Sequence, residues 1–252
     1  ANARAVPGVA PRQFFNRNQF GGSLGGPIIK DRLLFFTNTE LTRIRSSANI
    51  FALVPSEASI AAAAPATRAF FAGYTLNARP TGRTQSLTST SGRVLTFNEV
   101  QYTVPANTGA GTPEDGVQSA NRIDWNVSDR LQIYGVYALE KRTFLEGSNA
   151  NSPYAGFSTG AETDNTNMQI AGTYQLTDNL IGVSRFTYNK LDQSQPLGEQ
   201  PDGPTLYLRT SAQSVGGVRI AFPGYLPFNP GSAIPFGGPQ TVYNAAQEFS
   251  YN

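Results

Sequence analysis

The sequence predicts an all-β protein built from antiparallel hairpins, on the evidence of alternating polarity, short polar turns and a glycine-rich first segment. Apolar and polar residues alternate through 119–142 and 164–191, as in strands that bury only one face. Each stretch is interrupted once by a turn of a few polar residues, which is too short for anything but an antiparallel connection. Segment 18–29 contains four glycines, and each interior glycine costs a helix roughly 1 kcal/mol.

The first hairpin is expected over residues 18–45. Its second half, 33–42, is rich in the aromatic and β-branched residues that strands favour. Between the halves, Lys30, Asp31 and Arg32 leave room only for a tight turn. The glycines before this turn fit either a strongly bent strand or one whose backbone another segment approaches closely.

The second hairpin is expected over 119–142, and its two faces differ in polarity. One face carries Ile123, Trp125, Val127, Leu131, Ile133, Gly135, Tyr137 and Leu139. The other face carries Arg122, Asp124, Asn126, Gln132, Tyr134, Val136, Ala138 and Glu140.

The third hairpin is expected over 164–191 and repeats this plan. One face of its first strand carries Met168, Ile170, Gly172, Tyr174 and Leu176. The returning strand is ambiguous, because Ile181 and Val183 compete with Phe186 and Tyr188 for the apolar face. A further strand begins within 244–252.

Short and long connections alternate along the chain. Residues 1–17 form a lead-in, and long loops are expected over 46–118, 143–163 and 192–243, the first of them containing a short helix and a small hairpin. Outer-membrane β-barrels have this arrangement, with short periplasmic turns and long extracellular loops.

The predicted fold is therefore a partial antiparallel transmembrane β-barrel of about six or seven strands. Its apolar faces would meet lipid and its polar faces the lumen, with Trp125 and Tyr137 in the aromatic girdles. Because the smallest bacterial barrels have eight strands, we expect the chain to be an internal fragment of a longer protein.

Composition supports a barrel and argues against several classes of function. Charged residues make up only 14% of the 252 residues, while aromatic residues reach 11%, too many for a disordered chain. The chain has no cysteine and no histidine, so the commonest metal ligands and general bases are missing. The net charge of +2 is too small to indicate a nucleic-acid partner. We therefore expect no enzyme activity, no metal site and no cofactor.

Two sets of side chains are candidates for function. Arg122, Asp124, Glu140 and Arg142 are expected to face the lumen, with each arginine paired to the carboxylate two positions away on its own strand. Aromatic residues of the last long loop lie among proline and glycine and form either a ligand-capturing surface or a self-packed loop: Tyr207, Phe222, Tyr225 and Phe228. The paired carboxylates at 114–115, 162–164 and 199–202 match no calcium-loop spacing and are interpreted as solvated loops.

Segment 18–36, NQFGGSLGGPIIKDRLLFF, is followed by Glu40, Arg43 and Arg45. It resembles the start of the barrel in TonB-dependent outer-membrane receptors, above all the group with an N-terminal carboxypeptidase-regulatory-like domain. The lead-in RQFFNRNQF, the second hairpin and the final TVYNAAQEFSYN are also similar to that family.

The resemblance implies uptake of a scarce, bulky substrate, such as an oligosaccharide, a peptide or a metal chelate, across the outer membrane of a Gram-negative (diderm) bacterium. The partners it implies are outer-membrane lipid, the protein's own plug domain and the TonB energy-transducing complex, the last through segments outside this chain. In such a receptor the four lumen-facing charges either neutralise one another in the wall or contact the plug.

Two other classes remain open from the sequence. One is a non-transporting surface β-barrel or adhesin, which would have no plug. The other is a soluble β-sandwich binding module, which would bury the 131–139 apolar face against protein.

Overall fold

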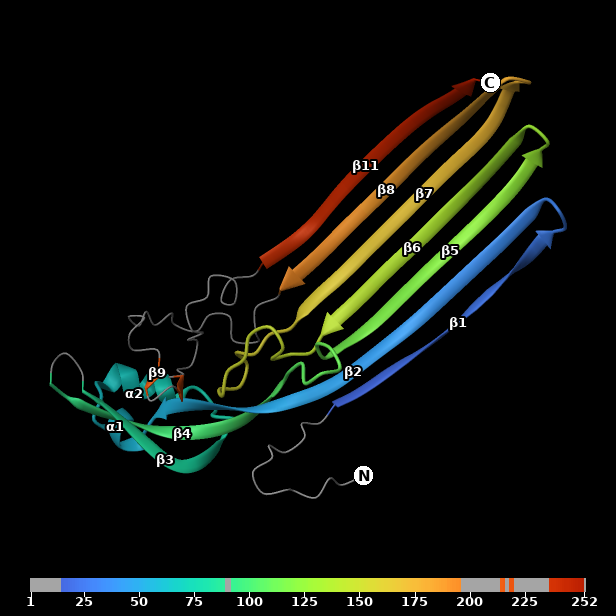
Figure 1. The fold of residues 1–252 in the computed structure, drawn as a ribbon. Helices are drawn as coiled ribbons and strands as arrows, with labels where there is room; N and C mark the ends of the chain where they lie inside the picture. The colour runs from blue at the N-terminus through green and yellow to red at the C-terminus, as the bar shows by residue number, and fades with distance from the viewer. Residues whose placement is uncertain (1–14, 89–91, 196–213, 216–217, 220–235, 252) are drawn as a thin grey trace.

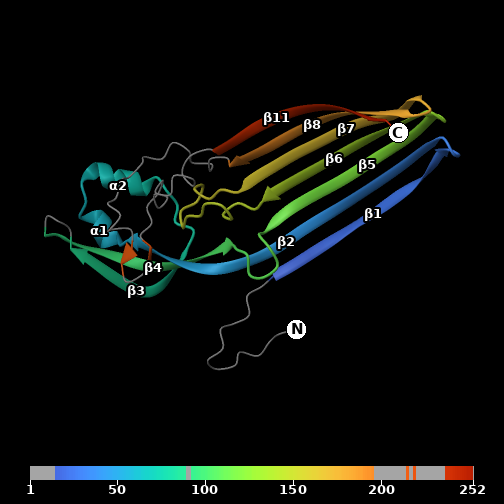
Figure 2. The same ribbon diagram turned by 45° about the horizontal axis from the view of Figure 1, so that its top comes forward.

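The computed structural model describes residues 15–88, 92–195, 214–215, 218–219 and 236–251, and it is dominated by one antiparallel sheet of nine strands (Figure 1). Seven of these strands lie side by side and form a long, curved wall: β1 (Phe15–Ile29), β2 (Leu33–Pro55), β5 (Glu114–Ser128), β6 (Leu131–Phe144), β7 (Ala161–Thr177), β8 (Leu180–Gln195) and β11 (Phe236–Tyr251). The sheet is not closed, because β1 and β11 lie at its opposite edges (Figures 1 and 2). The expected all-β, partial-barrel fold is confirmed.

The three predicted hairpins form β1–β2, β5–β6 and β7–β8, and their tight turns lie at one end of the wall. In the first turn Asp31 has a φ of 60°, a left-handed conformation that Asp tolerates better than most residues. The turn closes with the amide of Arg32 donating to the carbonyl of Ile29 at 3.1 Å. All longer connections leave from the other end of the wall, which we call the loop end.

Several strands are longer than the alternation indicated. Residues 46–55, expected to begin the first long loop, continue β2 without a break. They do so because residues 47–55 pair with β4, whereas 33–44 pair with β5. The last strand similarly starts at Phe236, eight residues before the expected position 244.

At the loop end, the segment between β2 and β5 forms a small unit with its own core. It contains α1 (Glu57–Ala61), α2 (Pro65–Ala72), β3 (Arg79–Thr88) and β4 (Val94–Pro105), and two-residue strands β9 (Ser214–Val215) and β10 (Val218–Arg219) lie nearby. The expected short helix is thus two helices, because Pro65 can begin a helix but cannot continue one. This core also contains residues of β2 and of the connection between β6 and β7: it includes Ala52, Val100, Tyr102, Tyr154 and Phe157.

The register places the two faces of the wall without ambiguity. Directly paired residues share a face, so the row Trp125, Ile133, Gly172 and Ser184 belongs to one side, and the row Arg122, Val136, Gln169 and Thr187 to the other. We call the first side the outward face and the second the inward face. On β8, Phe186 pairs with Ile170 and Tyr188 with Met168. The apolar face of β8 is therefore the one that carries Phe186 and Tyr188.

The outward face is apolar and yet uncovered in the part of the chain that the structure describes. Ile123 and Trp125 are 51% and 49% exposed. A β-sandwich would bury these side chains against a second sheet, so the sandwich alternative is not supported. Among the described residues, no helix has the length and hydropathy needed to span a bilayer.

Candidate functional site

The candidate site is the inward face of the wall, where polar side chains of six neighbouring strands gather. Alternation along each strand places them there, because every second side chain points to the same side. The predicted residues Arg122, Asp124, Glu140 and Arg142 all lie on this face. They form two separate clusters, at different heights along β5 and β6.

The cluster nearer the turns contains Arg122, Asp124 and Tyr134. Nε of Arg122 donates to Oδ2 of Asp124 at 2.8 Å, and its Nη2 donates to Oδ1 at 2.6 Å. The guanidinium also lies over the ring of Tyr134, with Cζ 4.4 Å from the ring centroid, a favourable cation–π arrangement. The ion pair expected from the two-residue spacing is present. Both carboxylate oxygens of Asp124 accept hydrogen bonds from Arg122 in this pair.

The second cluster is arranged differently from the expectation. Arg142 donates from Nη2 to Oε2 of Glu114 at 2.6 Å and from Nε to the same atom at 3.0 Å. Its Nη1 is 3.9 Å from Oε1 of Glu140, the expected partner. Glu114 is therefore the main partner, and its side chain is only 6% exposed.

Glu114 and its neighbour Asp115 were interpreted as part of a solvated loop, and this interpretation is wrong. They begin β5 and point to opposite faces of the wall. Asp115 accepts two hydrogen bonds from Nη2 of Arg45, at 2.8 and 2.9 Å. Glu162 and Asp164, given the same interpretation, likewise lie within a strand, β7. In the sequence, each of these two carboxylate pairs lies just before an alternating segment. That position was the only sign that the residues belong to a strand.

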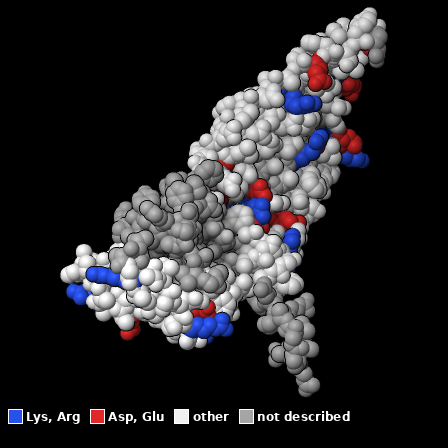
Figure 3. All heavy atoms as spheres, turned by 60° about the vertical axis from the view of Figure 1, so that its left-hand side comes forward, with Lys and Arg blue, Asp and Glu red and all other residues white. Residues whose placement is uncertain are grey.

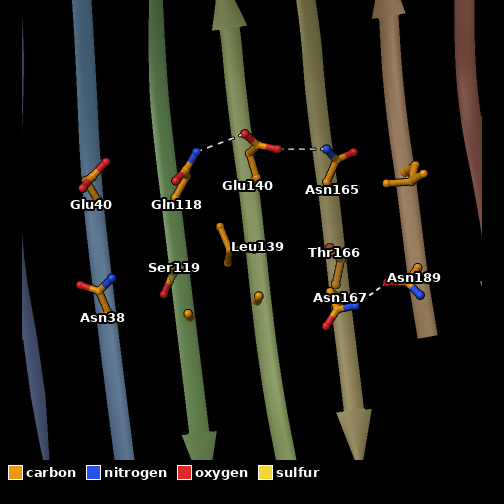
Figure 4. A pocket seen from close by; sticks show the side chains of 13 residues that line it. Asn38, Glu40, Gln118, Ser119, Leu139, Glu140, Asn165, Thr166, Asn167 and Asn189 are labelled. Atoms are coloured by element: carbon orange, nitrogen blue, oxygen red, sulfur yellow. Dashed lines mark hydrogen bonds between the residues drawn. The ribbon is translucent and has the colours of Figure 1, made fainter. Parts of the chain in front are cut away.

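Glu140 belongs instead to a row of carboxamides and carboxylates that crosses the wall (Figure 4). Gln118 donates to one carboxylate oxygen of Glu140 at 3.2 Å, and Asn165 donates to the other at 3.1 Å. On β1 and β2, Gln19 donates to Glu40 at 2.7 Å. This row was not predicted, because its members lie on five strands that are distant in sequence.

A hollow of about 420 Å³ opens beside this row. Ala120 and Ala138 are among its lining residues, and their small side chains leave more space than the larger polar side chains that also line it. The surrounding side chains include Asn38, Asn167 and Asn189, and the amide of Asn167 donates to that of Asn189 (Figure 4). The hollow therefore offers hydrogen-bond donors and acceptors together with the carboxylates of Glu40 and Glu140.

Two further ion pairs of the wall lie on the outward face, near the loop end. Nζ of Lys141 is 3.1 Å from Asp164, and Nζ of Lys190 is 3.0 Å from Asp192. On the side of the molecule drawn in Figure 3, acidic and basic side chains of the wall lie next to each other rather than in patches of one sign.

Other predicted site residues fall outside this description. The carboxylates at 199–202 and the loop aromatics Tyr207, Phe222, Tyr225 and Phe228 lie outside the described residues. Within the described ranges, no three His, Cys, Asp or Glu side chains come together as a metal site would require.

An open antiparallel wall with one apolar and one polar face is the arrangement of a transmembrane β-barrel. Comparison with protein families agrees, since the model of an outer membrane beta barrel domain matches residues 1–252. The chain therefore belongs to this family of outer-membrane β-barrel domains. Searches of curated proteins and of solved structures found no match.

Proposed function

We propose that the chain forms part of the barrel of a TonB-dependent receptor, which takes up a scarce, bulky substrate across the outer membrane. The proposal rests on the inward face and on the breadth of the wall. The resemblance of segment 18–36 to the start of such barrels adds to it.

The breadth of the wall favours a wide barrel. A barrel of eight strands is so narrow that side chains can fill its interior. Outer-membrane transporters with a plugged lumen have about 22 strands. Seven strands of this wall leave β1 and β11 far apart at opposite edges (Figure 2). A barrel of about 22 strands would have room for a plug domain in its lumen.

The inward face favours a lumen that contains protein rather than water alone. Leu34 and Phe36 pair with Asp124 and Arg122, so they also point inward, and they are 39% and 47% exposed. Apolar side chains in a water-filled pore would gain nothing from that position, whereas a plug could bury them. The charged residues around them are already paired, so a plug would meet few uncompensated charges.

Binding to TonB tests the proposal. The full-length protein, purified from outer membranes, is mixed with the purified periplasmic domain of the TonB protein of the source organism. We expect saturable binding that is lost when the segment preceding residue 1 is deleted, while the deletion variant retains the heat-dependent gel shift of a folded barrel. A folded full-length protein that does not bind TonB would contradict the proposal and favour the non-transporting surface barrel.

A further inference from the structure

A hollow of about 550 Å³ also lies on the outward face of the wall, across β6, β7, β8 and β11, and we call it the outward hollow. Gly172 and Ala245 keep it open, because they carry little or no side chain in two neighbouring rows of this face. Larger apolar side chains surround them: Leu131, Ile133, Ile170 and Phe186. Arg185 and Ala246 also border the hollow, but they belong to a row of the inward face.

Three polar side chains line the part of the outward hollow nearer the turns. The ring of Tyr174 lies against β8, where a Cβ built on Gly182 would be only 2.5 Å from Cε2 of the ring. The phenolic oxygen accepts a hydrogen bond from Nε2 of Gln247 at 2.8 Å and one from Oγ of Ser184 at 3.4 Å. In the described part of the chain this phenol accepts hydrogen bonds but donates none, so its proton is available to an acceptor from outside.

The outward hollow has the polarity of a lipid molecule. Its row farthest from the turns contains Ile170, Phe186 and Ala245, which are all apolar. On β7, the first charged outward residue from Tyr174 toward the loop end is Asp164, ten residues away. Ten residues of a strand tilted by about 40° rise about 25 Å, which is the height of the apolar band of a barrel. Tyr174 therefore begins at the turn-side boundary of the membrane, and the apolar row lies toward the membrane centre.

Another polar group on the outward face is built differently. Thr37, Thr39, Ser119 and Asn121 lie on β2 and β5 and interrupt the apolar surface there. Thr37 donates to Asn121 at 2.7 Å, and the hydroxyls of Thr39 and Ser119 lie 3.1 Å apart. Because these hydrogen bonds join members of the group to one another, this part of β2 and β5 is a suitable comparison surface for lipid binding.

We propose that the outward hollow binds one glycerophospholipid of the periplasmic leaflet. An acyl chain lies over Gly172 and Ala245, and the carbonyl oxygen of its ester accepts the proton of Tyr174. Lipid surrounds this face of a barrel, and the short turns mark the periplasmic side, where the leaflet consists of phospholipid. A phenol without an acceptor carries a cost in hydrocarbon, and the ester carbonyl is the acceptor nearest to the acyl chain. This inference concerns the membrane surface and does not depend on TonB-dependent transport.

Photolabelling in a membrane tests the site directly. The full-length protein is reconstituted in vesicles of phosphatidylethanolamine and phosphatidylglycerol that contain a small fraction of phosphatidylethanolamine with a diazirine in its acyl chain. We expect labelling of residues 170–174 and 245–247 to exceed that of residues 35–39 and 119–123 several-fold. Equal labelling of these two surfaces, or a hollow that stays unlabelled because protein covers it, would overturn the proposal.

Two pairs of variants separate the shape of the hollow from its hydrogen bond. Gly172→Leu fills the hollow without a clash, since the atom nearest to an added Cβ is 3.8 Å away, and Gly22→Leu is the matched change at an open outward glycine of β1. Tyr174→Phe removes the phenolic hydroxyl but keeps the ring on Gly182. Tyr137→Phe is the matched change at an outward tyrosine that does not line the hollow.

Native mass spectrometry of the delipidated full-length protein, titrated with phosphatidylethanolamine, measures the strength of binding. We expect the first lipid to bind at least tenfold more weakly to Gly172→Leu and at least threefold more weakly to Tyr174→Phe, with both matched controls unchanged. A heat-dependent gel shift verifies the folding of every variant. Binding to Gly172→Leu as strong as to wild type would refute the site, and unchanged binding to Tyr174→Phe would refute the hydrogen bond.

Discussion

Gly21 and Gly22 are adjacent in β1 and offer a sharp comparison between a crowded and an open glycine. A Cβ added to Gly21 would lie 2.3 Å from the carbonyl oxygen of Thr39 and 2.9 Å from Cα of Glu40. A Cβ added to Gly22 would meet nothing within 4 Å. Gly21→Ala and Gly22→Ala are therefore chemically identical changes in opposite environments.

The size of the effect follows from these distances. Carbon and oxygen atoms that are not bonded to each other approach to about 3.3 Å, so β1 must move by about 1 Å from β2 to accommodate the methyl group that Gly21→Ala adds. Overpacking of this kind costs about 1–3 kcal/mol, and each weakened ladder hydrogen bond adds about 1 kcal/mol. We expect Gly21→Ala to lower the free energy of unfolding by about 3 kcal/mol, on the scale of these two costs together. Without a clash, replacing glycine in a strand stabilises it by about 0.5–1 kcal/mol, which is the expectation for Gly22→Ala.

Urea titration of the full-length barrel in lipid vesicles, followed by tryptophan fluorescence and by the heat-dependent gel shift, measures both variants. The single tryptophan of this chain, Trp125, lies on β5 next to β2. Gly21→Ala should shift the midpoint to lower urea, and Gly22→Ala should leave it unchanged or raise it. Equal midpoints for the two variants would refute the packing argument, since a general glycine effect cannot distinguish them.

Two further predictions concern the inward face and the loop-end unit. Arg142→Ala leaves the nearly buried carboxylate of Glu114 without its main partner. Because an unsatisfied buried group of this kind costs about 2 kcal/mol, the variant should unfold at lower urea in the same titration, and adding Glu114→Gln should restore most of the loss. An unchanged midpoint in the single variant would contradict this. Burial raises the pKa of the Tyr154 phenol, so the folded state favours the neutral form of this side chain. The stabilisation that the neutral phenol provides is complete below the ordinary pKa of about 10. This stabilisation is lost as the pH rises from there toward the raised pKa of the folded state. The measurement is amide hydrogen exchange of segment 145–160, corrected for the intrinsic pH dependence of exchange. Above a pH of about 10, wild type should lose protection in this segment, and Tyr154→Phe should lose less. The same loss of protection in both proteins would exclude Tyr154 as the cause.

The sequence sufficed for the features that depend on neighbours along the chain. Alternation and turn length predicted all three hairpins and the polar face that carries Arg122 and Asp124, since residues two positions apart share a face of a strand. Spacing along one strand could not find the partner of Arg142, because Glu114 comes from the adjacent strand at a diagonal position. The distance between the side chains of Arg142 and Glu114 depends on the register and twist of the two strands. The alternation of polar and apolar residues does not encode either of these.

Two other features were hidden for related reasons. Residues 46–55 contain no clear alternation, and their strand forms against β4, which follows about 50 residues later. Threonine favours strands on either face, so Thr37 and Thr39 supported the strand prediction without revealing that they interrupt an apolar surface.

The direction of the two edge strands limits how the wall can be extended. β1 and β11 both run toward the turns, because an even number of antiparallel steps separates them. Any set of strands that joins these edges by antiparallel pairing must therefore contain an odd number of strands, so that the closed barrel has an even total. Two copies inserted with the same orientation would offer each other only parallel edges. Edge-to-edge pairing of two such copies would therefore require a parallel ladder, whereas the strand pairings of the described wall are all antiparallel.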